Sequence, residues 1–185
     1  MAREWNIRSR GHACAACGKN FEDKRACVSL LLDTPEGFMR DDYCTACWRG
    51  LKDQPREGVV SVWEGIYEAP VRNTKPEVVT RETADALFRR LVILDDPETQ
   101  PVVYVLAVML ERAKRLVERG RREHESGGVL RVYEDKATGD SFVVIDPRLR
   151  MDQIAKVQED VAALLQPAGD GQTAPNPALA ADGCG

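Results

Sequence analysis

The sequence lacks several features that mark particular classes of protein. Histidine occurs only at His12 and His124, and aromatic residues make up 6% of the chain. The longest apolar run, Val102 to Leu110, is about half as long as a membrane span, and the N-terminus has no unbroken apolar stretch typical of a signal peptide. Phosphate-loop, nucleophile-elbow and dinucleotide-binding motifs do not occur. We therefore expect a protein of the reducing cytoplasm that is not an enzyme and does not contact a membrane.

The chain has no overall excess of positive charge that would attract nucleic acid. The formal net charge is −4, and residues 1–75 contain 12 Lys and Arg against 11 Asp and Glu. Residues 1–32 are locally basic, with six Lys and Arg against three acids. A patch suited to nucleic acid would consist of Arg8, Arg10, Lys19, Lys24 and Arg25 with Trp5 and Trp48. The simpler interpretation is that both tryptophans cover a small core.

Six cysteines stand out against this background, and four of them form two closely spaced pairs. The pattern is Cys14-x2-Cys17-x26-Cys44-x2-Cys47, and each pair can present two thiolates to one metal ion. We predict one structural zinc ion, because four thiolates fill a tetrahedral shell and leave no position for a substrate. Two disulfides fit the cytoplasm poorly, and a redox CxxC centre would need a βαβ pattern. A four-cysteine iron centre stays open, because spacing alone does not separate the two metals.

Other residues near the pairs have simple interpretations. His12 could replace one ligand, but we favour an exposed residue at the edge of a loop. Cys27 falls at the start of a strand-like run and is expected to be a small buried residue. Cys184 is expected to be exposed near the C-terminal end. The basic residues that could offset the thiolate charge are Lys19, Arg25, Arg49 and Lys52.

The distribution of turns and apolar residues predicts an α+β protein. An N-terminal zinc ribbon is expected, in which a β-hairpin lies between two zinc knuckles, and Val59 to Tyr67 form a further strand. A small helical unit with a β-hairpin and a C-terminal helix follows. The predicted parts are a zinc ribbon at 1–55, a strand and linker at 56–74, a helical and β-hairpin domain at 75–166, and a disordered tail at 167–185.

Apolar spacing predicts three helices and a hairpin in the second half of the chain. A capping box at residues 74–77 precedes the first helix, whose apolar stripe is Ala84, Leu87, Phe88, Leu91 and Leu94. The second helix is predicted to start at Asp96-Pro97, to cross the core from Val102 to Leu110, and to continue from Glu111 to Gly127 as an amphipathic helix. The hairpin is predicted from Val129 to Asp146 and the last helix near Met151 to Leu165.

Other charged groups are expected to lie in solvent. Asp41 and Asp42 have no histidine or lysine partner in an apolar setting, so we place them at a solvated strand edge and interpret Asp96 as a helix cap. The basic residues between Arg112 and Arg122 alternate with glutamates. That alternation favours a solvated helix face over a phosphate-binding surface.

Two resemblances accompany these patterns. The segments CAACGK and CTACW resemble the two knuckles of the zinc-ribbon class, which implies roles in transcription and translation machinery or in protein docking. The chain also resembles an uncharacterised family of bacterial proteins of similar length, with no assigned activity, which implies a bacterial cytoplasmic setting. The segments that carry this second resemblance are WNIRSRGHACAACGKNF, DDYCTACW, LAVMLERAKRL, RVYEDKATGDSFVVIDP and VQEDVAALL.

We therefore expect a non-enzymatic zinc-ribbon protein that acts as a protein-interaction or adaptor module. A factor bound to nucleic acid, ribosome or transcription machinery through the basic and aromatic surface of the ribbon is the alternative.

Overall fold

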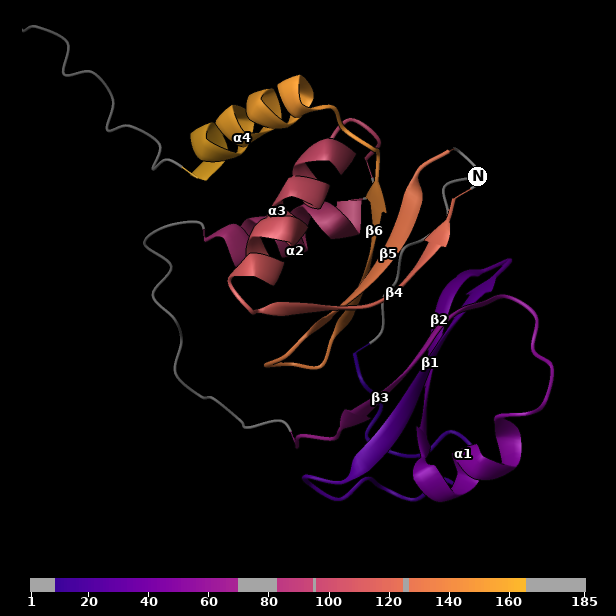
Figure 1. Ribbon diagram of the computed structural model, residues 1–185. Coiled ribbons are helices and arrows are strands. Elements are labelled where there is room, and N and C mark those ends of the chain that lie inside the picture. The colour runs from indigo at the N-terminus through magenta and orange to yellow at the C-terminus, as the bar shows by residue number, and fades with distance from the viewer. Residues whose placement is uncertain (1–8, 70–82, 95, 125–126, 166–185) are drawn as a thin grey trace, which may run out of the picture.

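The computed structural model describes residues 9–69, 83–94, 96–124 and 127–165. Over these residues the chain is an α+β protein with two small antiparallel sheets and four helices (Figure 1). The elements in chain order are β1 (Ala26–Thr34), β2 (Gly37–Cys44), α1 (Thr45–Leu51), β3 (Val59–Ile66), α2 (Ala84–Leu94), α3 (Gln100–Arg112), β4 (Leu116–Glu123), β5 (Val129–Asp135), β6 (Ser141–Asp146) and α4 (Met151–Leu165).

The first sheet has the strand order β2-β1-β3 and is antiparallel throughout. β1 and β2 form a hairpin, and the Thr34 hydroxyl closes its turn by donating to the Gly37 carbonyl at 2.7 Å. Gly37 has φ = 120°, a conformation that glycine adopts without a Cβ clash. The hairpin lies between the two cysteine pairs, as the sequence predicts, and the strand predicted at Val59 to Tyr67 is β3.

The two faces of the first sheet are covered by different parts of the chain. Because side chains alternate in direction along a strand, Leu30 and Tyr43 lie on one face while Leu31 and Trp63 lie on the other. Leu30 and Tyr43 pack with Cys14 and with half-buried residues of α1. Leu31 and Trp63 pack against the second sheet. The first sheet therefore lies between the second sheet and the layer formed by Cys14 and α1.

The second sheet has the strand order β4-β5-β6 and is also antiparallel. β5 and β6 form the hairpin predicted between Val129 and Asp146. The Asp135 carboxylate fixes the connecting turn by accepting hydrogen bonds from the amides of Ala137 at 2.7 Å and Thr138 at 3.3 Å. An isolated two-stranded hairpin is marginally stable in water, and β4 supplies the third strand that the sheet needs.

The strand β4 shows that the helix predicted from Glu111 to Gly127 is wrong. Helix α3 ends early, and Lys114 follows it with φ = 59°, which an α-helix does not accommodate. Residues from Leu116 onward pair with β5. The charged side chains of this segment are predicted from the sequence to lie on a solvated helix face. In the structure one of them forms an ion pair between strands, in which the Arg131 guanidinium on β5 lies 2.7 Å from the Glu118 carboxylate on β4.

Helices α2, α3 and α4 lie on one side of the second sheet, and α3 separates α4 from it (Figure 1). Their buried residues form one cluster with Leu116, Tyr133 and Phe142 of the sheet. Leu106, in the middle of α3, is fully buried, as the apolar run predicts. Leu94 is exposed, so it does not belong to the buried stripe of α2. No helix in the described part of the chain is long and apolar enough to cross a membrane.

The ends of the helices differ in part from the predictions. α3 begins at Gln100 with Pro101 in its first turn, not at Asp96-Pro97. Asp96 forms a separate turn, in which its carboxylate accepts a hydrogen bond from the Glu98 amide at 3.0 Å. The last helix, α4, has the predicted bounds. The predicted capping box at 74–77 and the predicted tail at 167–185 lie outside the described residues.

The layers stack in the order helices, second sheet, first sheet, and α1 with the cysteine-bearing turn (Figure 1). Residues predicted as separate units, 1–55 and 75–166, contact each other through the two sheets. The strands β3 and β4 also meet, because the Ser61 hydroxyl donates to the Arg119 carbonyl at 2.7 Å. The apolar contact between the sheets consists of Leu31, Phe38, Val60, Trp63, Leu130, Val132 and Val143.

Candidate metal centre

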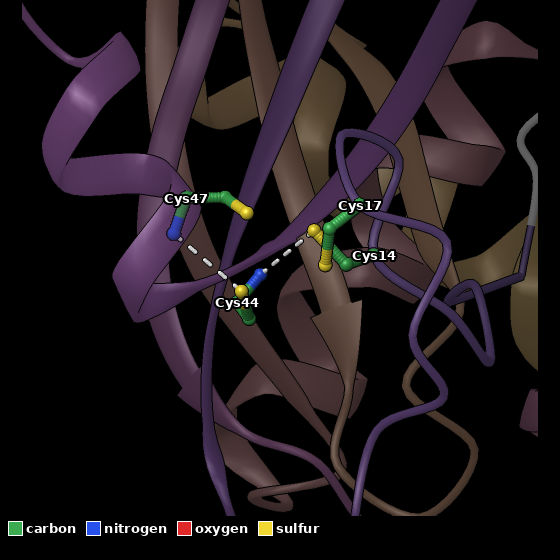
Figure 2. A group of neighbouring side chains, drawn as sticks. All are labelled: Cys14, Cys17, Cys44 and Cys47. Carbon is green, nitrogen blue, oxygen red and sulfur yellow. Dashed lines mark hydrogen bonds between the residues drawn. The ribbon is translucent and has the colours of Figure 1, made fainter.

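The first cysteine pair lies in a tight turn that precedes β1. A bridge between Ala13 and Asn20 closes the turn, and the Gly18 amide donates to the Cys14 carbonyl at 2.9 Å. Gly18, directly after Cys17, has φ = 68°, a conformation that glycine tolerates best. This turn brings the Cys14 and Cys17 sulfurs side by side (Figure 2).

The second pair lies where β2 passes into α1. Cys44 ends β2 and is the N-cap residue of α1, and its sulfur accepts a hydrogen bond from the Cys47 amide at 3.5 Å. Its own amide donates to the Cys14 sulfur at 3.4 Å, which joins the two pairs (Figure 2). Residues three apart in a helical turn share a side, so Cys44 and Cys47 both face the first pair. The helix α1 is not among the elements predicted from the sequence.

Together the two pairs form one group of four sulfurs. The Sγ atoms of Cys14, Cys17, Cys44 and Cys47 all lie within 4.8 Å of one another. A tetrahedral ion with metal–sulfur bonds of about 2.3 Å separates its sulfurs by about 3.8 Å. The sulfur–sulfur distances thus exceed this value by no more than about 1 Å, which small side-chain rotations can close. The group could therefore hold a metal ion.

The thiols already differ in their affinity for protons. Burial raises the pKa of Cys14, but hydrogen bonds from the backbone amides of Cys44, Cys17 and Ala16 outweigh that effect and lower the pKa to about 6. Hydrogen bonds with the side chains of Cys44 and Cys17 raise the pKa of Cys47 to about 12. A bound dication would relieve the repulsion that prevents all four thiols from losing their protons together.

No protein-family model, curated protein or solved structure matches this chain. The site is therefore interpreted from its own chemistry. Four thiolates are soft ligands, which favour zinc, copper(I) or iron–sulfur clusters over magnesium or calcium. Among the residues that the structure describes, no second group of His, Cys, Asp and Glu side chains has this arrangement.

The neighbouring His and Cys residues lie where the sequence places them, as far as they are described. His12 is exposed and is not part of the sulfur group, and its Nδ1 lies 2.8 Å from the Tyr67 hydroxyl. Cys27 is buried in β1, and this burial raises the pKa of its thiol. Cys184 lies outside the described residues.

Three described members of the predicted basic patch form ion pairs with glutamates. Arg10 is half-buried, and its side chain forms an ion pair at 2.5 Å with a glutamate of β5. Lys24 and Arg25 form ion pairs with glutamates at 2.6 Å and 2.9 Å. Arg8 and Trp5 lie outside the described residues.

Trp48 supports the simpler interpretation, in which a tryptophan covers a small core. Its ring packs against Tyr43 at a centroid distance of 5.6 Å, and the Arg56 guanidinium lies 5.9 Å from its centroid. Trp48 also contacts the apolar cluster that contains Cys14. The side chain thus shields the layer that carries the sulfurs.

Asp42 is buried, so the prediction of a solvated strand edge is wrong for this residue. Its Oδ1 accepts hydrogen bonds from the Ser29 hydroxyl at 2.6 Å and from Arg40 at 3.1 Å, and its Oδ2 accepts one from the Gly11 amide at 2.7 Å. Arg40 and Asp42 are two residues apart on one strand and therefore lie on the same face. This spacing is the signal in the sequence that would have indicated an ion pair between the two side chains, although not its burial.

Proposed function

We propose that this chain is a non-enzymatic protein-interaction or adaptor module of zinc-ribbon type with one structural zinc ion. The zinc ligands are the sulfurs of Cys14, Cys17, Cys44 and Cys47. The observation that carries the proposal is that these four sulfurs lie within 4.8 Å of one another. A shell of four thiolates has no open position for water or substrate, so the ion has an architectural role.

The layer around the sulfurs has little apolar core of its own, which supports this role. Its buried residues are Cys14, Leu30 and Tyr43. Small domains with so few buried residues usually need a disulfide or a metal. Structural zinc contributes on the order of 10 kcal/mol in small domains. Zinc would therefore fix the first cysteine turn and α1 against the first sheet.

Metal analysis of the purified protein tests this proposal. We expect one zinc per chain, and we expect Cys17→Ser and Cys47→Ser to lower the zinc content and the thermal stability. Cys27→Ser is the matched control, because Cys27 is a cysteine of β1 outside the sulfur group. Iron in place of zinc would give visible absorption. Metal content that is the same in Cys47→Ser and in the unchanged protein would refute the site.

The charge distribution favours a protein partner over nucleic acid. Described residues 9–69 contain eight Lys and Arg against ten Asp and Glu. Arg10 and Arg40 are engaged in buried ion pairs, and the exposed Lys24 and Arg25 pair with glutamates. A surface of mixed charge attracts a nucleic-acid backbone weakly. Such a surface suits contacts with another protein, where charges of both signs are used.

The alternative is a factor that binds nucleic acid near the sulfur group, and it rests on Lys19, Arg49 and Lys52. All three are exposed and close in sequence to the ligands. Fluorescence anisotropy with RNA and DNA at low salt separates the two functions. The adaptor proposal predicts no binding beyond that of a variant with all three residues changed to alanine. Salt-dependent binding that this variant loses, while Lys156→Ala retains it, would establish the alternative.

A further inference from the structure

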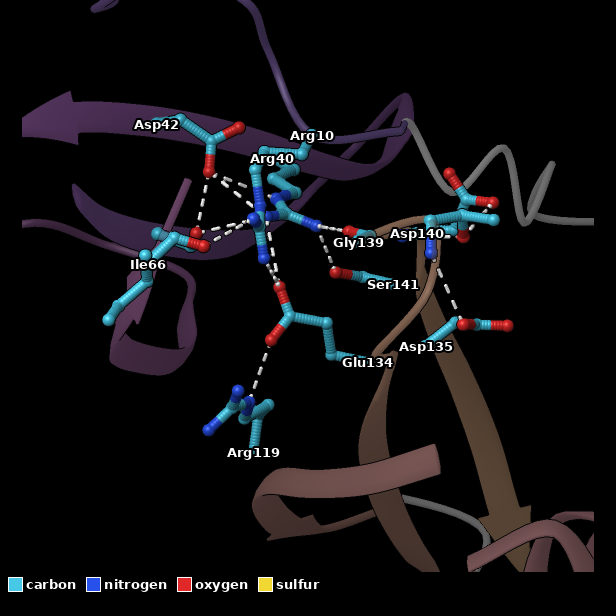
Figure 3. Close-up of polar contacts among 12 residues, drawn as sticks. Arg10, Arg40, Asp42, Ile66, Arg119, Glu134, Asp135, Gly139, Asp140 and Ser141 are labelled. Atoms are coloured by element: carbon cyan, nitrogen blue, oxygen red, sulfur yellow. Dashed lines mark hydrogen bonds and ion pairs between the residues drawn. The ribbon is translucent and has the colours of Figure 1, made fainter. Parts of the chain in front are cut away.

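Five charged side chains meet in the contact between the two sheets (Figure 3). Arg40 is the most central, because its guanidinium lies 3.1 Å from Asp42 and 3.5 Å from Glu134. It also donates hydrogen bonds to the Gly139 carbonyl at 2.7 Å, to the Ser141 hydroxyl at 2.5 Å and to the Ser29 hydroxyl at 3.0 Å. The side chains of Arg40, Asp42 and Glu134 are 1%, 2% and 2% exposed. We call this set the inter-sheet ion cluster, and its members are Arg10, Arg40, Asp42, Arg119 and Glu134.

The segment that carries the first cysteine pair completes this cluster. Arg10 donates to Glu134 Oε1 at 2.5 Å, a shorter contact than that of Arg40 with the same oxygen. The Gly11 amide donates to Asp42 Oδ2 at 2.7 Å, while the Ser29 hydroxyl and Arg40 bind the other oxygen. The shortest contact of Glu134 Oε1 therefore comes from Arg10, and that of Asp42 Oδ2 comes from the Gly11 amide.

Residues 9–20 have few apolar anchors of their own. Within this segment only Cys14 is buried as a whole residue. The backbone hydrogen bond to the first sheet runs from the Ala15 amide to the Asp42 carbonyl at 2.8 Å. Single side-chain hydrogen bonds also join Arg10 to the Ile66 carbonyl and His12 to the Tyr67 hydroxyl, both at 2.8 Å. Cys14 and Cys17 would add a bond through the metal to β2 and α1. The ion would therefore be the strongest attachment of residues 9–20 to the rest of the protein.

We propose that the metal ion controls how firmly the two sheets are held together, by fixing residues 9–20 and through them the inter-sheet ion cluster. This inference rests on the metal site proposed above. When the ion leaves, Arg10 and the Gly11 amide withdraw from Glu134 and Asp42. Buried carboxylates that lose partners destabilise the surfaces that enclose them. The contact between the sheets then loosens, whereas the core formed by α2 and α3 persists.

Hydrogen–deuterium exchange of the full chain, with and without a zinc chelator, tests the coupling. Chelation should accelerate exchange in peptides that cover residues 132–142, as well as in residues 9–69, while α2 and α3 stay protected. Acceleration confined to residues 9–69 would overturn the proposal. Loss of protection in α2 and α3 as well would indicate global unfolding and would also overturn it.

The variant Arg10→Met provides a second, independent measurement. Coupling between two sites is reciprocal, so removing the Arg10 guanidinium should weaken zinc affinity by roughly 5- to 150-fold in a chelator competition. Arg150→Met is the matched control, because its ion pair with Asp152 is exposed and lies at the start of α4, so its loss should leave the affinity unchanged. Equal affinities in Arg10→Met and Arg150→Met would contradict the coupling. A chain that binds no zinc at all would instead refute the metal site itself, so the two failures are distinguishable.

Discussion

Replacing Arg40 by methionine should destabilise the protein more than any comparable change of a surface arginine. Methionine preserves much of the length of the side chain but removes every polar contact of the guanidinium. The side chain of Arg40 is 1% exposed, and both carboxylates that it contacts are 2% exposed. Water therefore cannot replace the lost partner without opening the contact between the sheets.

The size of the effect follows from this burial. Breaking a buried ion pair by removing one partner costs about 3–5 kcal/mol, because the other charge stays buried. For a chain of 185 residues, each kcal/mol lowers Tm by about 2–4 °C, so we expect a decrease of about 6–20 °C. The ion pair of Arg25 with Glu22 is the comparison, since both side chains are 73% exposed. Exposed pairs contribute about 0–1 kcal/mol, so Arg25→Met should leave Tm nearly unchanged.

Urea denaturation followed by tryptophan fluorescence measures the difference. Trp63 reports directly on the site, because the Arg40 guanidinium lies 5.2 Å from its ring centroid. A shift of the midpoint without a change of the m value indicates a loss of stability alone. The free energy of unfolding of Arg40→Lys should lie between those of Arg40→Met and the unchanged protein, because lysine keeps the charge but not the planar fork of donors. A free energy of unfolding for Arg40→Met within 1 kcal/mol of the Arg25→Met value would refute the reasoning.

Three further outcomes follow from single residues. Leu106→Asp should unfold the helical layer, because it buries an unpaired charge in a fully buried position; an unchanged melting temperature would contradict this. Gly58→Ala should lower stability, because Gly58 has φ = 74° and an added Cβ would lie 2.2 Å from the Asp33 carbonyl oxygen; wild-type urea midpoints would contradict it. Burial alone would raise the pKa of Asp146, but the Arg131 guanidinium outweighs this effect and lowers the pKa. This carboxylate therefore stabilises the fold above about pH 4, and its contribution is lost as pH falls through the lowered pKa. Asp146→Asn should make the acid side of the stability profile shallower, and an identical profile would show that this pair does not contribute.

Local sequence patterns were sufficient for the hairpins and for the grouping of the four cysteines. The alternation in β1 and β2, the turn residues between them and the spacing of Cys14, Cys17, Cys44 and Cys47 are signals contained within about thirty residues. The second hairpin and α4 were predictable for the same reason.

Features that depend on contacts between distant segments were not predictable. The residues of β4 carry charges spaced as in an exposed helix, and they form a strand because β5 offers an edge for pairing. Asp42 looks solvated in sequence, but Arg40 and the second sheet bury it. Arg10 and Glu134 lie 124 residues apart, so no local pattern connects them.

The strand β3 lies at the edge of the first sheet, and two other segments of the chain contact it there. Arg10 donates to the Ile66 carbonyl at 2.8 Å, and farther along the strand the Ser61 hydroxyl donates to the Arg119 carbonyl at 2.7 Å. A bare edge strand is a template on which the strand of another molecule can add, which leads to aggregation. The Arg10 side chain and the backbone of β4 at this edge therefore help to keep separate copies of the protein from joining into a continuous sheet.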